Sequence, residues 1–218
     1  MKTFIKPAKF LAVVALFGAV SLSAFSEGVD YIKLEKPLSV DNQTLTKVFS
    51  YACPFCYKYD KSVTPKVVSK VSGLKFVPYH LKTKGEYGEA ASKILAVLAT
   101  MDEAKGIDLL SDDSLFKKAK MAYYKAYHDK KERWNDGANE EAFLKTGLEA
   151  AGVSQADYEA ALGSQKVKSL LTKWDESYDV AKIQGVPAFV VNGKYLIMTA
   201  KITSIDQMAN LIEELLKK

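Results

Sequence analysis

Residues 49–60 read FSYACPFCYKYD, and this stretch decides both the fold and the chemistry of the chain. It contains the only two cysteines of the 218 residues, Cys53 and Cys56. The apolar residues just before them predict a strand over 45–51, and the period that follows predicts a helix over 53–71 with a kink at Pro65. We therefore expect the cysteines to lie where a strand passes into a helix.

The first 24 to 26 residues have the layout of a secretory signal peptide. Three lysines and no acidic residue precede the apolar run FLAVVALFGAV (10–20), and small polar residues follow it. This run is about half the length that a membrane-spanning helix needs. We expect residues 1–24 to be removed by cleavage after Ala24 or Ser26, and the mature protein to occupy an exported space where disulfides form.

Charge and composition exclude several classes of protein. Without the three N-terminal lysines, 28 basic residues face 26 acidic ones, and Arg133 is the only arginine. A nucleic-acid binder relies on arginine for bidentate contacts, so we expect no nucleic-acid partner. A closed zinc site needs four ligands, and the chain offers only two cysteines and two histidines, His80 and His128. We expect no metal and no cofactor.

Three structural roles for the cysteine pair compete with a redox role. A disulfide across so short a loop would stabilise the fold by only about 2 kcal/mol, because it removes little entropy from the unfolded chain. Half a zinc site would need both histidines, and two inert thiols would not explain why an exported chain keeps its only cysteines two residues apart. We therefore interpret Cys53 and Cys56 as a redox-active disulfide.

A helix that begins at Cys53 makes the two sulfurs unequal. Cys53 is then the N-cap and Pro54 the first helical residue, where a missing N–H costs nothing. The free N–H groups and the positive end of the helix stabilise a Cys53 thiolate, which we expect to face solvent. Cys56, one turn into the helix, is expected to be shielded and to act as the resolving thiol. A stabilised thiolate is a good leaving group, so the disulfide should be oxidising.

The remaining pattern predicts a small mixed sheet interrupted by helices. Strands are expected at 31–34 and 75–81, a hairpin at 188–191 and 195–198 around Asn192-Gly193, and a final helix at 204–217. Ser154 and Ser204 fit helix caps. About a hundred residues of helical period lie between 83 and 183.

Residues 49–60 and 184–196 (QGVPAFVVNGKYL) together resemble the DsbA-like thiol oxidoreductases of the bacterial periplasm. The resemblance covers nearly the whole mature chain and implies an α/β, thioredoxin-like fold with an inserted all-helical subdomain. The thioredoxin-like domain would comprise 27–82 and 180–218, and the insertion 83–179. Phe55 and residues 127–134 (YHDKKERW) are most similar to the DsbL branch.

The resemblance also implies roles for individual residues. Cys53 would be the nucleophile that links to substrate, and Cys56 its partner. Pro187 would be the cis-proline that faces the disulfide, with Val186 presenting its backbone to an extended substrate. A plain turn at Pro187 is the alternative.

The residues that tune the Cys53 pKa depart from the DsbA pattern. Phe55 stands where DsbA has a histidine, and Lys47 stands where it has an acid six residues before the first cysteine. A cation below the site would favour the thiolate. The interpretation we favour is that Lys47 reaches from the sheet edge into water.

We expect structural roles for both histidines and for most of the aromatic residues. His80 and His128 are expected to be structural or surface residues, because thiol exchange needs no third residue. The aromatic residues are expected to pack in the core and between the subdomains: Tyr51, Tyr57, Tyr59, Tyr79, Tyr123, Tyr124 and Trp134.

The function predicted from these observations is a monomeric periplasmic oxidase that donates the Cys53–Cys56 disulfide to exported proteins with reduced cysteines. The resemblance implies re-oxidation by an inner-membrane quinone reductase of the DsbB or DsbI type, and an arylsulfate sulfotransferase as a client. A disulfide reductase or isomerase, and a non-redox thioredoxin-like binding module, remain alternatives.

Overall fold

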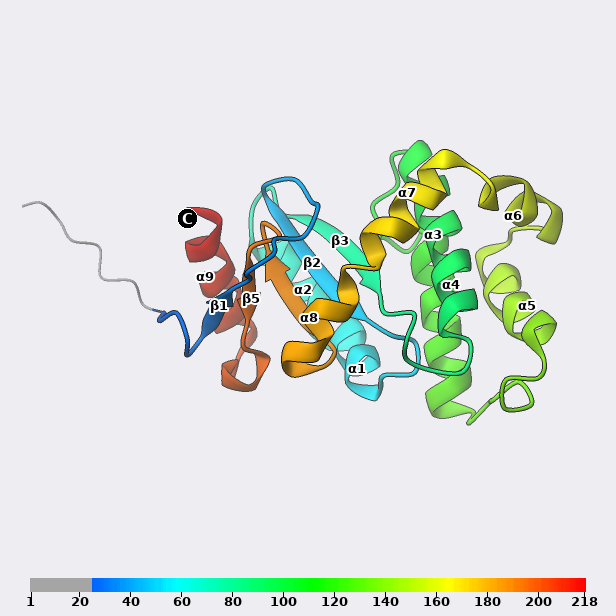
Figure 1. Ribbon diagram of the computed structural model, residues 1–218, viewed down its shortest axis with the longest axis horizontal. Coiled ribbons are helices and arrows are strands. Elements are labelled where there is room, and N and C mark those ends of the chain that lie inside the picture. Colours follow the sequence, from blue (N-terminus) through cyan, green and yellow to red (C-terminus); the bar gives the residue numbers. More distant parts are fainter. Residues whose placement is uncertain (1–24) are drawn as a thin grey trace, which may run out of the picture.

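The computed structural model describes residues 25–218, which form a five-stranded mixed sheet with the strand order β1-β5-β4-β2-β3 (Figure 1). The strands are β1 (Tyr31–Lys33), β2 (Thr44–Phe49), β3 (Lys75–His80), β4 (Ala188–Val191) and β5 (Tyr195–Ile197). Strands β2 and β3 are parallel, and every other neighbouring pair is antiparallel. The centre of the sheet therefore joins β2 to β4, segments about 140 residues apart in the chain.

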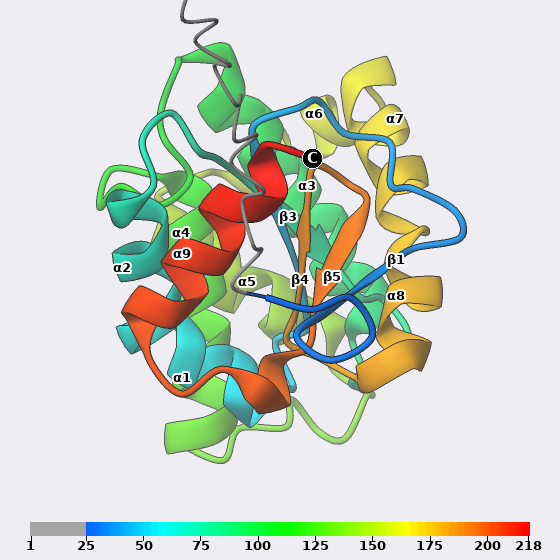
Figure 2. The ribbon, with the colours of Figure 1, turned by 90° about the vertical axis from the view of Figure 1, so that its left-hand side faces the viewer.

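Helices cover both faces of this sheet (Figure 2). Helices α1 (Pro54–Ser62), α2 (Thr64–Lys70) and α9 (Ile205–Leu216) lie on one face, and α8 (Ser177–Gln184) lies on the other. Alternation along the strands explains this division. Phe189 and Val191 of β4 pack in the cluster with α2 and α9, whereas Ala188 and Val190 pack in the cluster on the opposite face.

A block of helices follows β3 and lies beside the sheet (Figure 1). It contains α3 (Gly88–Ala104), α4 (Leu115–Tyr124), the π-helix η1 (Lys125–Asp129), α5 (Glu140–Ala151), α6 (Gln155–Leu162) and α7 (Gln165–Trp174). The helical block shares one apolar cluster with the face of the sheet that carries Ala188 and Val190. The expected aromatic packing is confirmed there for Tyr51, Tyr57, Tyr79, Tyr123, Tyr124 and Trp134, and Tyr59 packs against the opposite cluster.

Local signals placed several element ends correctly. Asn192 and Gly193 both adopt positive φ, at 51° and 66°, in the predicted hairpin turn. The side chains of Ser154 and Ser204 cap α6 and α9 as predicted. The expected single helix over 53–71 is wrong in detail, because α1 ends at Ser62 and α2 starts at Thr64, with Pro65 in its first turn.

The two outer strands of the sheet differ in length and composition. Strand β1 has three residues, and β3 has six, including Pro78. A proline in a strand is tolerated where its nitrogen does not have to donate to a neighbouring strand. This position is compatible with β3 as an edge strand.

Two predictions from the sequence concern the N-terminus and the domain boundaries. The predicted signal peptide, residues 1–24, lies outside the described residues. Among residues 25–218, no helix is both long and apolar enough to cross a membrane. The division into domains at residues 82 and 180 stays a prediction.

Candidate active site

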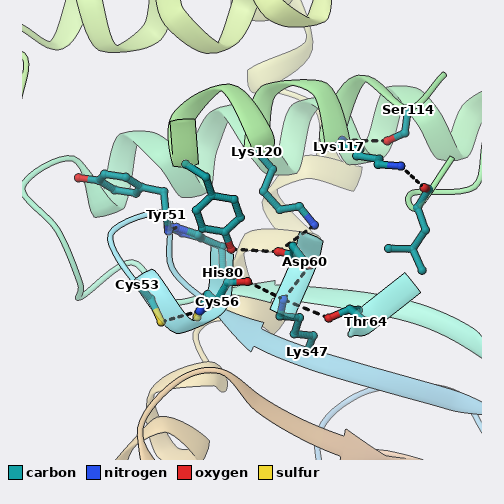
Figure 3. Close-up of polar contacts among 12 residues, drawn as sticks. Lys47, Tyr51, Cys53, Cys56, Asp60, Thr64, His80, Ser114, Lys117 and Lys120 are labelled. Atoms are coloured by element: carbon teal, nitrogen blue, oxygen red, sulfur yellow. Dashed lines mark hydrogen bonds and ion pairs between the residues drawn. The ribbon is translucent and has the colours of Figure 1, made fainter. Parts of the chain in front are cut away.

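Cys53 and Cys56 lie at the start of α1, directly after the loop that leaves β2 (Figure 3). Cys53 is the N-cap, with extended backbone (φ −99°, ψ 113°), and Pro54 is in the first turn. The backbone N–H of Cys56 donates to Cys53 Sγ at 3.1 Å. The predicted N-cap geometry is therefore present, with the two cysteines as free thiols.

The two thiols have opposite pKa shifts. A hydrogen bond from the Cys56 thiol lowers the pKa of Cys53 to about 7, helped by the Cys56 N–H and the positive charges of Lys84 and Lys47 against the opposing effect of burial. Burial, together with the hydrogen bond and charge of Cys53, raises the pKa of Cys56 well above its usual value. One sulfur is therefore a thiolate near neutral pH while the other keeps its proton.

The expectation that Cys53 faces solvent is wrong. Cys53 is only 1% exposed, because the loop before β4 covers it and the Val186 carbonyl oxygen lies 3.2 Å from its sulfur. The neighbouring Phe55 is 64% exposed.

The Val186–Pro187 loop lies against the cysteines, as the resemblance implied. The peptide bond between these residues is cis. The Cys53 thiol donates to the Val186 carbonyl across 133 residues of sequence. The structure thus brings together the two segments that the sequence analysis singled out, while the roles of Val186 and Pro187 toward substrate stay predictions.

Lys47 does not reach water, which corrects the interpretation favoured from the sequence. It is fully buried, and its Nζ lies 2.7 Å from Asp60 Oδ1 (Figure 3). The same Nζ donates to the Cys56 carbonyl and to Thr64 Oγ1, each at 3.3 Å. The physical reason is that α1 and α2 cover the face of the sheet from which Lys47 projects, since its Nζ contacts Cys56 and Asp60 of α1 and Thr64 of α2.

Two further residues of this charged group were missed from the sequence. Lys120 Nζ lies 3.3 Å from Asp60 Oδ2, and the Tyr124 hydroxyl donates to the same oxygen at 3.0 Å. Although burial opposes it, the charges of Lys120 and Lys47 hold the pKa of Asp60 below its usual range. The available signal was a lysine four residues after Phe116, within the stretch of helical period between 83 and 183.

Both histidines hold the backbone of Tyr51, two residues before Cys53. His80 is buried, its Nε2 accepts from the Tyr51 N–H at 3.4 Å, and its Nδ1 contacts Ser92 Oγ at 2.7 Å. Burial lowers the pKa of His80 to about 3. His128 Nε2 lies 2.9 Å from the Tyr51 carbonyl oxygen. The predicted structural role of the histidines is confirmed in their geometry.

Comparison with known proteins agrees with this geometry. A model of the DSBA-like thioredoxin domain matches residues 44–213. The chain belongs to the DsbA-like thioredoxin family. The thiol:disulfide interchange protein DsbL of Escherichia coli O6:H1 is 62% identical over 209 residues, covering 95% of this chain and 94% of that protein. The corresponding DsbA of Yersinia pestis is 32% identical and covers 86% and 84%.

Within the DsbA-like family, the similarity to DsbL is also structural. The crystal structure of DsbL from Salmonella enterica serovar Typhimurium matches with a TM-score of 0.88 and 63% identity, covering 90% of this chain and all of that one. The predicted thioredoxin-like fold and the resemblance to the DsbL branch are confirmed. The chain is a thiol:disulfide oxidoreductase of the DsbA type, and proteins of this type act on the cysteines of substrate proteins.

Proposed function

We propose that the chain is a dithiol oxidase that donates a Cys53–Cys56 disulfide to substrate proteins. A substrate thiolate attacks Cys53 Sγ, the Cys53–Cys56 bond breaks, and Cys56 leaves as a thiolate that takes up a proton. A second substrate thiolate then attacks the substrate sulfur of the mixed disulfide and releases the Cys53 thiolate. Two electrons pass from the substrate to the cysteine pair.

The observation that carries this proposal is the opposite pKa shift of the two thiols. A pKa of about 7 makes the Cys53 thiolate a good leaving group in the second step. The raised pKa of Cys56 favours its protonated form once the bond has opened. The stabilised Cys53 thiolate favours the reduced pair, and this makes the disulfide an oxidant.

The covering loop supports a place for the substrate. The Val186 carbonyl contacts Cys53, so an extended substrate segment that pairs with the Val186 backbone would bring its own sulfur to the reactive one. Exposed Phe55 adds an apolar surface beside that path. We assign substrate binding to this loop.

The proposal extends to compartment, organisation and partners. The N-terminal pattern and the family support a periplasmic protein whose residues 1–24 are a signal peptide. Residues 27–82 and 180–218 would form the thioredoxin-like domain and 83–179 the helical insertion. A membrane quinone reductase of the DsbB or DsbI type would restore the disulfide, and an arylsulfate sulfotransferase would be one client.

Two measurements on the exported, purified protein test the oxidase. Equilibration with glutathione buffers should leave the pair reduced until oxidised glutathione is in large excess. Cys56→Ser should accumulate a mixed disulfide on non-reducing gels with an oxidised client, because its Cys53 thiolate opens a client disulfide and no Cys56 thiol is present to release the complex. The matched Cys53→Ser variant should form none. A pair that stays oxidised in mostly reduced glutathione would favour the reductase alternative, and exchange by Cys53→Ser would exclude the assigned nucleophile.

A further inference from the structure

The charged group below the cysteines contains more positive than negative charge. Asp60 Oδ1 is paired with Lys47 at 2.7 Å, and Oδ2 is paired with Lys120 at 3.3 Å. The side chains of these three residues are between 0% and 4% exposed. One carboxylate thus faces two ammonium groups inside the protein, and we call these residues the Asp60 cluster.

The Asp60 cluster is directly connected to the redox pair. Lys47 donates to the backbone carbonyl of Cys56, and Asp60 lies four residues after Cys56 on α1 (Figure 3). The charge of Lys47 lowers the pKa of both Cys53 and Cys56. Any group that changes how far Asp60 neutralises Lys47 therefore changes the field at the sulfurs.

Lys120 is the member that comes from outside the sheet and α1. It projects from α4 of the helical block, with its Nζ 5.0 Å from the ring centre of Phe116 and 5.5 Å from that of Phe49. An apolar side chain would suit such surroundings, because a buried cation has a large desolvation cost. Burial lowers the pKa of Lys120 to about 8, in agreement with that cost.

We propose that Lys120 is a positioning residue for thiol exchange, which occupies one oxygen of Asp60 so that Lys47 keeps an uncompensated positive charge under Cys53 and Cys56. Without Lys120, Lys47 and Asp60 form a neutral pair. The Cys53 thiolate then loses stabilisation, and the disulfide becomes less oxidising. The inference rests on the proposed role of Cys53 as the reactive thiol.

The first experiment replaces Lys120 and measures the Cys53 thiolate by its ultraviolet absorbance against pH. Lys120→Met should raise the Cys53 pKa by about 0.3 to 0.5 units. At a pH well above that pKa, it should move the glutathione equilibrium about two- to threefold toward the disulfide, since one unit is tenfold. Lys120→Arg, which keeps the charge, should restore both values. Lys118→Met, the same change at an exposed position of α4, should alter neither.

A double variant separates charge from packing. Asp60→Asn combined with Lys120→Met removes one negative and one positive charge and leaves Lys47 uncompensated, so the Cys53 pKa should return toward the parent value. A purely structural Lys120 predicts instead that the double variant is no closer to the parent than Lys120→Met. Should Lys120→Met not fold, as judged by circular dichroism, Lys120→Gln carries the same test.

Two results would overturn the inference. One is a folded Lys120→Met or Lys120→Gln protein with an unchanged Cys53 pKa, and the other is failure of Lys120→Arg to restore a shifted value. Failure of the proposed function would look different, because the parent protein itself would then lack an acidic Cys53 thiol.

Discussion

Helix α4 contacts two buried carboxylates, and they are satisfied in opposite ways. Asp102, at the end of α3, accepts from Ser114 Oγ at 2.7 Å and from the N–H groups of Leu115 and Phe116, each at 3.0 Å. Those donors are neutral and belong to the N-terminus of α4, where a negative charge is favoured. Asp60 belongs to α1 and meets α4 farther along that helix, at Lys120. It is paired with two lysines, Lys47 and Lys120.

The difference separates a buried carboxylate that serves stability from one that affects the pKa of the cysteines. The Asp102 site joins two helices with neutral donors and lies in the helical block, away from the cysteines. The Asp60 cluster keeps a surplus charge beside the residues that react. We therefore expect substitutions at Asp102 to change stability alone, and substitutions in the Asp60 cluster to change the thiol chemistry.

The largest effect is expected at the structural carboxylate. Asp102→Ala leaves two backbone donors and a hydroxyl without their acceptor and should lower the free energy of unfolding by about 2 to 4 kcal/mol. Chemical denaturation measures this loss, with exposed Asp113→Ala as the matched control. A Cys53 pKa that moves in Asp102→Ala would break the distinction between the two carboxylates.

A smaller effect links the stability of the protein to the ionisation of Cys53. The pKa of the Cys53 thiol falls from about 9 in the unfolded chain to about 7 in the folded one. Between these two pH values the unfolded state binds more protons, so the free energy of unfolding rises with pH. The reduced protein should therefore gain about 1 to 2 kcal/mol over Cys53→Ser between pH 6 and pH 8.5. This contribution is lost as the pH falls through 7.

The controls for this pH effect use the same comparison. The disulfide form has no thiol to ionise and should lack the gain, whereas reduced Asp102→Ala should keep it at lower overall stability. Denaturation curves at each pH give these differences. A gain of equal size in the oxidised protein would assign the effect to other groups, such as Lys120, rather than to Cys53.

The smallest effect is expected for Lys47→Gln. This change leaves Asp60 paired with Lys120 and removes the charge that donates to the Cys56 carbonyl, so the Cys53 pKa should rise by about half a unit. Iodoacetamide labelling of the Cys56→Ala background against pH measures the shift, with exposed Lys75→Gln as control. An unchanged titration would show that Lys47 serves only the packing below α1.

The sequence predicted what local chemistry determines. The N-cap position of Cys53, the helix caps and the Asn192-Gly193 turn depend on neighbouring residues, and all three appear as expected. The strand pattern around the cysteines and the hairpin also sufficed for the central sheet. The position of Lys120 between Phe116 and Tyr123 was not used, and a lysine among apolar residues does not by itself identify the partner of its charge.

The sequence could not predict features that depend on distant packing. Cys53 is covered by the Val186 loop, and Lys47 is covered by α1 and α2. Asp60 meets Lys120 across 60 residues and from another part of the fold. These contacts exist only once distant segments have packed together, so residue type and spacing do not predict them.

The edges of the sheet have a consequence for an oxidoreductase that handles substrate proteins. Unfolded chains contain extended segments that add readily to an open strand, and a long edge invites aggregation. Here one border is only three residues long, and the other contains Pro78, which has no N–H to offer an incoming strand. The molecule can therefore meet unfolded polypeptides at its cysteines without serving as a template for their assembly.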